Sequence, residues 1–257
     1  MTNRQGDFIW YELMTTDPEG ARNFYSAVVG WDIEAKPSGE MDYRMIAAPD
    51  GLAGGMMALT PEMVAGGARC CWLGYIGVHD VDATVASIVA AGGAVQMPAW
   101  DIPGVGRIAM VTDPQGAPFY VMRGASDETS HAFETDKVGH CGWNELFTSD
   151  QTAALAFYSG QFGWIKDGAV DMGPMGEYSF IHQAGVPIGA MMNRPPESPP
   201  PFWNYYFRVA DIDAAVRAIK ETGGTILFGP QEVPGDQWSL QGIDPQGAPF
   251  GLVGRKL

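Results

Sequence analysis

Apolar and polar positions follow one order at the start of the chain. Segment 8–14 is rich in aromatic residues and predicts a strand. Asp17 and Pro18 then supply a helix N-cap and a proline at the first helical position, and Gly30 ends the predicted helix. The apolar face of this helix is made by Ala21, Phe24, Tyr25, Val28 and Val29. Three short strands are predicted near 31–35, 43–48 and 52–58.

The same order then restarts. A strand is predicted from Trp72 to Val78, followed by a helix that Asp80 caps and that ends at Gly92-Gly93. Further strands are predicted near 94–98, 106–111 and 118–123. Both blocks recur at 142–192 and 203–253, so the pattern predicts an α+β protein built from four βαβββ units.

The recurrence is also visible in the residues themselves. Asp113-Pro-Gln-Gly-Ala-Pro-Phe119 returns as Asp244-Pro-Gln-Gly-Ala-Pro-Phe250. Trp10 and Glu12 return as Trp143 and Glu145, while Trp72 returns as Trp203. The period is too long for a solenoid, whose repeats run about 20–50 residues. We therefore expect two duplicated modules, 1–125 and 139–257, joined by a linker at 126–138.

Composition narrows the function classes. Asp and Glu number 30 against 15 Lys and Arg, giving a net charge of -15. This charge argues against nucleic acid and anionic membranes as partners, because both need clustered basic residues. No apolar run approaches the roughly 20 residues of a membrane helix, and nothing resembles a signal peptide. Three cysteines without CxxC spacing fit reduced thiols, so a cytoplasmic protein is expected.

Several short motifs occur in the same order in both modules. They are a capping Asp, a helix with Phe-Tyr that ends in Gly-Trp, a Val-x-Asp-x-Asp-Ala segment, and Asp-Pro-x-Gly before the last strand. Their positions are Asp17, Phe24-Tyr25, Gly30-Trp31, Val78 to Ala83 and Asp113 to Gly116, and in the second module Asp150, Phe157-Tyr158, Gly163-Trp164, Val209 to Ala214 and Asp244 to Gly247. Together these motifs resemble the vicinal oxygen chelate superfamily, the glyoxalase/bleomycin-resistance/dioxygenase group. The resemblance implies tandem glyoxalase-like modules with cup-shaped mixed sheets, outer helices and a small-molecule ligand. Duplication also implies a monomer with pseudo-dimeric halves or a homodimer.

The resemblance further implies a metal held by His, Gln and Glu side chains on four strands of a cup. Counting from the motifs finds other residues there: Trp10, Leu73, Tyr120 and Gly55 in the first module, and Trp143, Asn204, Gly251 and Gly189 in the second. Catalytic divalent metals need imidazole, thiolate or carboxylate ligands, and the side chains of Trp, Leu, Tyr, Asn and Gly supply none of these. The four histidines do not fill these positions. We therefore predict no metal and no other cofactor.

Alternation along the first strand of each module places a glutamate on the face where the metal would lie. Glu12 shares that face with Trp10, and Glu145 shares it with Trp143. A buried carboxyl group must be paired, solvated or protonated, and the last state suits an acid/base catalyst. A purely structural role, in which each glutamate bonds backbone or a basic side chain, explains the duplication equally well. Both readings stay open.

Further candidates come from the other predicted strands. Tyr120 is a candidate catalytic residue, and the candidate ligand-binding residues are Trp10, Trp143, Tyr75, Asn204, Tyr206, Arg208, Met122 and Trp238. Arg208 is expected either to pair with Glu145 or to bind a substrate carboxylate. Trp100 and Trp238 are expected in loops where they could cover a pocket. Aromatic and methionine side chains suit a flat apolar ligand, although the same residues also fill ordinary cores.

Two functions remain from these observations. One is a metal-independent enzyme, of lyase, isomerase or hydroxylase-like type, acting on an aromatic or polyketide-like molecule. The other is a binding protein that sequesters such a molecule without turnover. Metal-dependent glyoxalase or dioxygenase activity is a third alternative. Cys70 and Cys71 lack a histidine partner, which argues against a nucleophilic cysteine.

Overall fold

The computed structural model describes residues 3–37, 41–195, 197 and 199–257, and its contacts divide the chain into two compact units. Unit 1 comprises Met1–Ile9, Gly74–Ser130 and Trp143–Trp203, and unit 2 comprises Trp10–Leu73, His131–Gly142 and Asn204–Leu257. Each unit therefore combines segments from both halves of the sequence. The predicted boundaries 1–125, 126–138 and 139–257 describe the duplication along the chain and stay a prediction.

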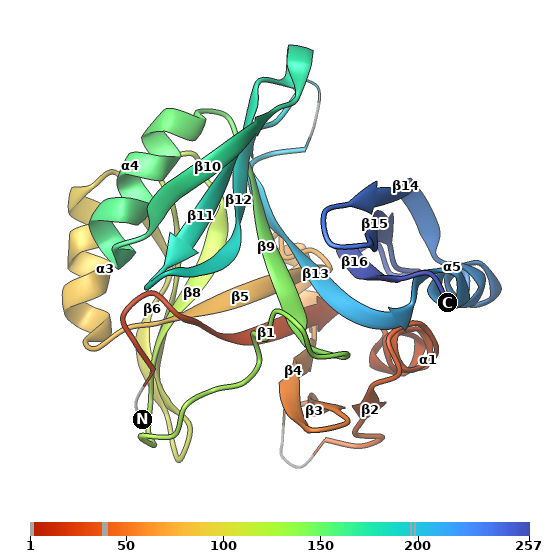
Figure 1. Cartoon of the computed structure of the whole chain (residues 1–257). Helices are drawn as coiled ribbons and strands as arrows, with labels where there is room; N and C mark the ends of the chain where they lie inside the picture. Colours follow the sequence, from red (N-terminus) through yellow and green to blue (C-terminus); the bar gives the residue numbers. More distant parts are fainter. Residues whose placement is uncertain (1–2, 38–40, 196, 198) are drawn as a thin grey trace. The chain divides into compact units, whose positions relative to one another are not determined.

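Unit 2 contains the first and the last of the repeated blocks (Figure 1). Its elements from the first half are β1 (Phe8–Thr15), α1 (Pro18–Val28), β2 (Asp32–Ile33), β3 (Tyr43–Ala48), β4 (Gly51–Ala58) and α2 (Pro61–Ala65). Its elements from the second half are β13 (Phe202–Asp211), α5 (Ile212–Glu221), β14 (Thr225–Val233), β15 (Gln237–Ile243) and β16 (Pro249–Arg255). The first residues of β1 and of β13 belong to unit 1.

Unit 1 contains the two middle blocks. Its elements from the first half are β5 (Cys71–Gly77), α3 (Val81–Ala90), β6 (Ala94–Ile102), β7 (Gly106–Thr112) and β8 (Pro118–Gly124). Its elements from the second half are β9 (Cys141–Thr148), α4 (Gln151–Phe162), β10 (Ile165–Asp171), the short 3-10 helix η1 (Gly173–Met175), β11 (Glu177–Gln183) and β12 (Val186–Asn193). The first residues of β5 and β9 belong to unit 2.

Each block pairs its strands in the same mixed way. In unit 2 the strand orders are β2-β3-β4-β1 and β13-β16-β15-β14, and in unit 1 they are β5-β8-β7-β6 and β10-β11-β12-β9. The first and last strands of a block are parallel, with Glu12 opposite Gly55 and Tyr206 opposite Gly251, because a helix returns the chain between them. The remaining neighbours are antiparallel. The predicted α+β fold with tandem modules is confirmed, since the strands of each half belong to one eight-stranded sheet.

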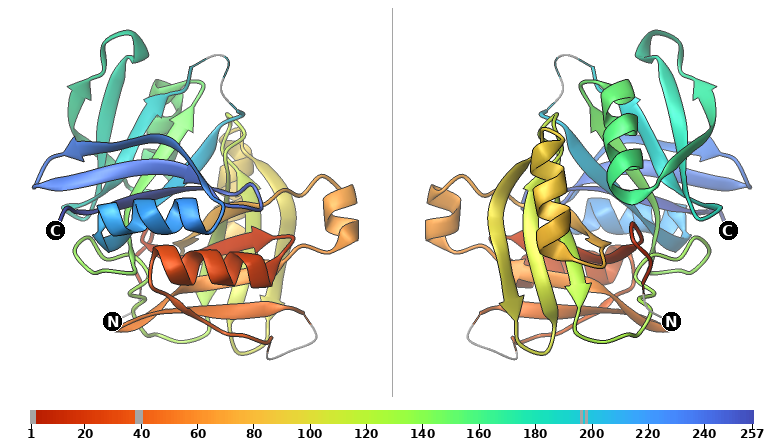
Figure 2. Two further views of the ribbon diagram at one scale, coloured as in Figure 1. Left: turned by 90° about the vertical axis from the view of Figure 1, so that its right-hand side faces the viewer. Right: turned by 90° about the vertical axis from the view of Figure 1, so that its left-hand side faces the viewer.

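The helices α1, α3 and α4 begin where the sequence predicts, whereas the short helix α2 was not predicted. The side chain of Asp17 accepts a hydrogen bond from Gly20, and that of Asp80 accepts one from Ala83. Asp150 caps α4 in the same way. A carboxylate at this position satisfies amide groups that the first helical turn leaves unpaired. Figure 2 shows the result within each unit, where α1 lies beside α5 and α3 lies beside α4.

A hydrogen-bonded aromatic network explains why the Asp-Pro-Gln-Gly-Ala-Pro-Phe motif is repeated. In unit 2, the indole nitrogen of Trp72 donates to the hydroxyl of Tyr25 at 2.9 Å, and that hydroxyl donates to Oδ2 of Asp244 at 3.1 Å. Oδ1 of Asp244 accepts the amides of Gln246 and Ala248 at 2.9 and 2.8 Å. One carboxylate oxygen of Asp244 therefore stabilises the turn of the motif, and the other binds the buried Tyr25 hydroxyl.

Unit 1 contains the same network with the halves exchanged. Trp203 donates to the hydroxyl of Tyr158 at 3.0 Å, and Tyr158 donates to Oδ2 of Asp113 at 3.2 Å. Here the aspartate comes from the first half and the tyrosine from the second, whereas in unit 2 the origins are reversed. Burial raises the pKa of Asp113 and of Asp244, while the amides and the tyrosine hydroxyls oppose that shift. Each half thus completes the core of the other.

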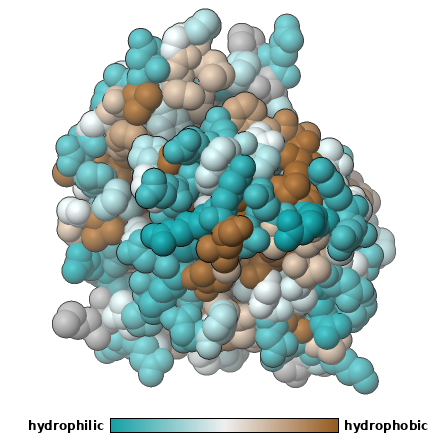
Figure 3. Space-filling model, turned by 45° about the vertical axis from the view of Figure 1, so that its right-hand side comes forward, coloured by the Kyte–Doolittle hydropathy of each residue, from teal (hydrophilic) through white to brown (hydrophobic). Residues whose placement is uncertain are grey.

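The surface mixes polar and apolar residues (Figure 3). The most exposed large apolar side chains within the described ranges include Leu227 and Phe228 of the edge strand β14, at 60% and 53% exposure. Among the described residues, no helix is long and apolar enough to span a bilayer.

Candidate functional site

The predicted site residue Trp10 lies at the start of β1 in unit 2 and is half-buried. Its indole nitrogen donates to the hydroxyl oxygen of Tyr43 on β3 at 2.8 Å. A Cβ added at Gly55 would lie 2.1 Å from that same hydroxyl oxygen. The glycine at 55 therefore makes room for the tyrosine. Phenol, not a metal-binding side chain, occupies the space beside this strand.

Unit 1 repeats this arrangement around Trp143 on β9. The indole nitrogen of Trp143 donates to the hydroxyl oxygen of Tyr178 at 2.8 Å, and the Trp143 ring lies 6.1 Å from that of Phe180. We name Trp10 with Tyr43, and Trp143 with Tyr178, the Trp–Tyr pairs. In both pairs the indole N–H is satisfied within the protein. What remains of each indole is a flat apolar surface.

Sequence reasoning missed the two tyrosines of these pairs. They were detectable, because Tyr43 and Tyr178 are 135 residues apart, the same offset that separates Met56 from Met191. Nothing in the local pattern distinguishes them from other strand tyrosines. Their role depends on a hydrogen bond to a residue 33 or 35 positions away.

The two predicted glutamates are deeply buried. Glu12 is 3% exposed in unit 2, and Glu145 is 5% exposed in unit 1. Each follows its tryptophan by two residues and so shares its face of the strand. Both residues have interaction partners within the protein. The structure therefore places one buried carboxyl group on the tryptophan face of each of these two strands.

Cys71, near Glu12, has an unreactive thiol. Burial raises the pKa of the Cys71 thiol to about 12, and the nearby charges of Cys70 and Glu12 add to the shift. A thiol with this pKa stays protonated at neutral pH and is a poor nucleophile.

The aromatic candidates on β5 and β8 pack on each other in unit 1. Tyr75 and Tyr120 are register neighbours, and their rings stack with centroids 4.3 Å apart. Trp100 meets the Tyr120 ring at 6.4 Å, and Met122 is opposite Gly77. Both tyrosines are buried. One face of the Tyr75 ring and one face of the Tyr120 ring are therefore covered by each other.

Three candidates share one face of β13 in unit 2, as alternation predicts. Asn204 and Tyr206 are buried, and Arg208 is half-buried. The hydroxyl of Tyr206 accepts a hydrogen bond from Gln241 at 2.6 Å. A Cβ on Gly251 would lie 2.5 Å from the Tyr206 ring, so the ring lies directly over the glycine. Tyr206 covers the position where the equivalent strand in unit 1 carries Tyr120.

The side chain of Arg208 has an uncharged partner within unit 2. Its Nη1 donates to Oε1 of Gln237 at 2.9 Å, and its Nε is buried without a hydrogen-bond acceptor among the described residues. Burial lowers the pKa of Arg208, Asp136 opposes this shift, and Arg255 adds to it. Glu145, the partner considered from the sequence, belongs to unit 1.

Trp100 and Trp238 are not in loops, and this expectation was wrong. Trp100 lies within β6 because a register shift between Met97 and Trp100 accommodates Pro98 inside the strand. Trp238 is the second residue of β15, opposite Gly254. The ammonium group of Lys256 lies 3.6 Å from its ring centroid. One face of Trp238 is thus covered by a cation.

The residues at the implied metal positions do not fit a metal. Tyr43 occupies the space beside Gly55, Tyr206 lies over Gly251, and Tyr120 stacks on Tyr75. Within the described ranges, no group of three or more His, Cys, Asp and Glu side chains is arranged to hold an ion. The loss of the metal stays a prediction that metal analysis must decide.

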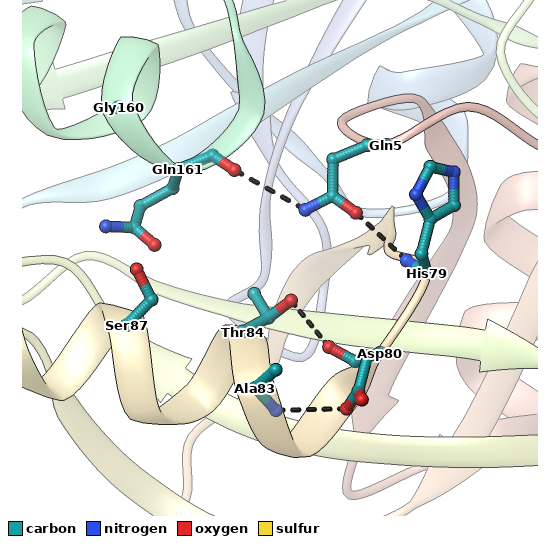
Figure 4. A pocket seen from close by; sticks show the side chains of 8 residues that line it. All are labelled: Gln5, His79, Asp80, Ala83, Thr84, Ser87, Gly160 and Gln161. Carbon is teal, nitrogen blue, oxygen red and sulfur yellow. Dashed lines mark hydrogen bonds between the residues drawn. The ribbon is translucent and has the colours of Figure 1, made fainter.

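A polar cavity of about 240 Å³ in unit 1 lies between the start of α3 and the end of α4 (Figure 4). Gln5 spans it, since its Nε2 donates to the Gln161 carbonyl at 3.4 Å and its Oε1 accepts the His79 amide at 2.9 Å. Asp80 accepts the Ala83 amide as the cap of α3. These polar groups are satisfied by one another, as expected for a structural joint.

Comparison with known proteins identifies one family and several full-length relatives. The family model described as the Glyoxalase/Bleomycin resistance protein/Dioxygenase superfamily matches residues 8–121 and again 137–250. The "Putative glyoxylase CFP32" of Mycobacterium tuberculosis is 34% identical over 252 residues, covering 97% of this chain and 95% of that protein. The "Anthracycline biosynthesis protein DauV" of Streptomyces sp. strain C5 is 29% identical, covering 95% of this chain and 91% of that protein.

Solved structures match in fold. The 2,2',3-trihydroxybiphenyl 1,2-dioxygenase of Sphingomonas wittichii gives a TM-score of 0.67 at 14% identity, covering 97% of this chain and 90% of that one. The Mn(II)-bound glyoxalase of Novosphingobium aromaticivorans gives 0.63 at 17% identity, covering 99% and 83%.

Proposed function

This chain belongs to the glyoxalase/bleomycin resistance protein/dioxygenase superfamily, and from that premise we propose that it binds an aromatic or apolar small molecule without a metal ion. The ligand lies against the Trp–Tyr pairs, whose tryptophans are on β1 and β9. Glu12 and Glu145 are the candidate acid/base groups for any chemistry on it. Small-molecule binding is a property of the superfamily, whereas the ligand class and the metal independence are the proposal.

The repeated Trp–Tyr pair carries this proposal. In both modules a half-buried indole has its only polar atom satisfied at 2.8 Å, so the ring offers a surface without a desolvation penalty. A flat aromatic ligand gains from stacking and from burial of apolar area on such a surface. Tyr75, Tyr206, Asn204 and Met122 are further candidates for contact with ligand, and Trp238 is one through its ring face not covered by Lys256.

Acid/base catalysis is supported by the position of the two glutamates. Each is two residues from its tryptophan on the same face of the strand, so a ligand on the indole lies near the carboxyl group. Tyr120 is the third candidate proton carrier. If catalysis occurs, we propose a lyase, isomerase or hydroxylase-like reaction. If it does not, the same surfaces sequester the ligand unchanged.

One relative supports the aromatic class of ligand. DauV is named for anthracycline biosynthesis, and anthracyclines are polycyclic aromatic compounds. A planar polycyclic ring has the shape that an indole surface binds well. We therefore choose a hydroxyanthraquinone as the probe.

Quenching of intrinsic fluorescence by the hydroxyanthraquinone tests the proposal. Trp10→Ala and Trp143→Ala should weaken binding about tenfold in the cup that is used, because a buried aromatic contact contributes about 0.5–1.5 kcal/mol beyond area burial. Phe228→Ala is the matched control, since Phe228 is an exposed aromatic on β14. Equal affinities in all variants would refute the site.

Positioning of the indole can be tested separately. Tyr43→Phe and Tyr178→Phe keep the ring but remove the oxygen that accepts the indole N–H. We expect each to weaken binding a fewfold only in its own cup. Comparing the two variants identifies which cup is occupied.

A matched pair of substitutions separates catalysis from sequestration. Glu12→Gln and Glu145→Gln keep the shape of the side chain and remove the titrating group. For an enzyme, one of them should abolish conversion of the bound probe with little change in Kd. For a sequestering protein, the recovered ligand is unchanged by wild type and variants alike.

The relative named as a putative glyoxylase raises metal-dependent glyoxalase activity as a second candidate. The side chains at the implied ligand positions do not favour it. An assay with the hemithioacetal of methylglyoxal and glutathione, with added Mn²⁺, Ni²⁺ or Zn²⁺, decides the matter. Metal-stimulated turnover would replace the proposal above.

A further inference from the structure

A second cavity, in unit 2, has a different chemistry from the Trp–Tyr pairs. It measures about 270 Å³ and lies at the end of β13, where Arg208, Gln237 and Arg255 meet Asp136 and Ala210. We name it the Arg208 pocket. Ligand pockets of whole drug-sized molecules usually measure about 300–1,000 Å³, so this one suits a small acid or the acidic end of a larger ligand.

The two arginines of this pocket lack carboxylate partners. In the described parts of the chain, neither Arg208 nor Arg255 has an Asp or Glu oxygen within ion-pairing distance of its side chain, and the one side-chain hydrogen bond of Arg208 goes to Gln237. Yet acidic residues outnumber basic ones 30 to 15. Asp136 acts on Arg208 only at longer range. A guanidinium group held out of ion pairs in so acidic a protein is available to an external anion.

Arg44 shows how this protein treats a structural arginine. Its side chain is 6% exposed, its Nε bonds Oδ1 of Asp42 at 2.7 Å, and its Nη1 bonds Glu19. Both ends of that guanidinium are neutralised by carboxylates, as buried charges require. Arg208 has a carboxamide at one end and no acceptor at the other. The buried structural arginine of unit 2, Arg44, is thus neutralised by carboxylates, whereas Arg208 is not.

The backbone fixes Arg208 in place. Its amide donates to the His140 carbonyl at 2.9 Å, and its carbonyl accepts from the Gly139 amide at 2.8 Å. Beyond it, the register of β13 against β16 shifts between Val209 and Asp211, which leaves Ala210 out of the ladder at the pocket. Bulges of this kind are common beside functional sites, where they redirect side chains.

The donors that remain are those of a carboxylate site. Gln237 already accepts from Arg208 through Oε1, so its Nε2 is left as a donor. On Arg208, Nη1 is used, while Nε and Nη2 have no acceptor among the described residues. Nε lies buried, so the donors that the pocket offers a ligand directly are Nη2 of Arg208 and Nε2 of Gln237, with the guanidinium of Arg255 beside them. Guanidinium groups bind carboxylates through pairs of such donors.

We propose that the Arg208 pocket binds a small organic carboxylate, with Arg208 and Arg255 as its cationic groups and Gln237 as a neutral donor. Two guanidinium groups against the one carboxylate of Asp136 leave a single positive charge, which matches a carboxylate better than a doubly charged phosphate. Neither Trp10 nor Tyr43 lines this pocket, and the inference does not rest on the proposed aromatic ligand.

Nuclear magnetic resonance of the arginine Nε–Hε groups tests where the acid binds. Cyclohexanecarboxylate is the probe, because it has no aromatic ring, and cyclohexanecarboxamide is its neutral control. We expect the Arg208 signal, assigned from its absence in Arg208→Lys, to shift and saturate with the acid and not with the amide. Inorganic phosphate should shift it more weakly. No saturable shift, or an equal response of all arginines, would overturn the proposal.

Binding constants from calorimetry give the second test. Arg208→Lys keeps the charge but loses the paired donors, and Arg255→Gln removes an exposed charge; each should weaken the acid at least fivefold. Lys220→Gln, an exposed lysine of α5 in the same unit, changes net charge equally and should alter Kd less than twofold. The melting temperature of each variant shows whether it is folded. If Arg208→Lys does not fold, the affinity of Arg255→Gln tests the proposal, because Arg255 is exposed. Wild-type affinity in Arg255→Gln, or an equal loss in Lys220→Gln, contradicts the inference.

Discussion

Units 1 and 2 contain the same hydrogen-bonded network but different surfaces beside it. The network runs from tryptophan through tyrosine to aspartate in both, with every distance within 0.1 Å of its counterpart. At the neighbouring strand pair, unit 1 stacks Tyr75 on Tyr120, whereas unit 2 lays Tyr206 over Gly251. The repeated network stabilises the fold of both units. The residues that differ, at the Tyr120 and Gly251 positions, change which side chains a ligand could contact in each unit.

This comparison changes the meaning of the most obvious repeat in the sequence. A heptapeptide that occurs twice invites a catalytic interpretation, but its aspartate is buried against amides and a tyrosine hydroxyl. The Trp–Tyr pairs belong to the repeated part as well, yet they are half-buried. Arg208 replaces the glycine found at the equivalent position, Gly77. Repetition alone therefore does not distinguish candidate functional residues from those that hold the fold.

The largest effect is expected from removing the shared network. Asp244→Ala and Asp113→Ala each leave a tyrosine hydroxyl and two backbone amides without their hydrogen-bond acceptor. Each substitution should therefore lower the free energy of unfolding by about 3–4 kcal/mol. Chemical denaturation measures both. The comparison requires similar losses in the two units. A loss below about 1 kcal/mol in either would show that the network is not equivalent.

A smaller effect should appear only in unit 2. Gly251→Ala would place a methyl group 2.5 Å from the Tyr206 ring, so it should cost about 1–3 kcal/mol by overpacking. In a Tyr206→Ala background the same change should cost much less. Gly160→Ala is the control, because nothing lies within 4 Å of its added Cβ and it is in helix α4. Additive losses in the double variant would contradict the contact.

The smallest expected effect is a pH dependence common to both units. Burial holds the folded pKa of Asp113 and Asp244 above the ordinary value of 3.8. Their protonation-linked contribution is therefore fully present below about pH 4 and is lost as the pH rises through the folded pKa. Relative to an Asp113→Asn and Asp244→Asn double variant, the wild type should lose stability as the pH rises above about 4. An advantage that grows with pH would reverse the assigned shift.

Much of the fold is predictable because its signals are local. Asp17 and Asp80 cap helices where predicted, and the strand positions follow from apolar segments bounded by glycine and proline. The errors also have local causes. Pro98 suggests the end of a strand, but a bulge carries β6 on to Ile102. Pro234-Gly235 suggests a loop at Trp238, but the turn is tight enough for β15 to start at Gln237.

The candidate site is less predictable because its partners are distant in sequence. Trp10 and Tyr43 are 33 positions apart, and Trp143 and Tyr178 are 35 apart. No periodicity encodes which polar groups meet across such separations. Alternation correctly placed Asn204, Tyr206 and Arg208 on one face, but it does not reveal that Gln237 and Arg255 lie beside Arg208.

Calorimetric titration of the protein with the hydroxyanthraquinone, before and after exhaustive chelation, tests metal-independent aromatic binding most directly. Elemental analysis of the same samples supplies the metal content. The account predicts less than a tenth of an equivalent of Fe, Mn, Ni or Zn per chain. It also predicts the same Kd in both titrations and after metal is added back. One equivalent of metal per chain, with binding lost on chelation and restored by the metal, would contradict it.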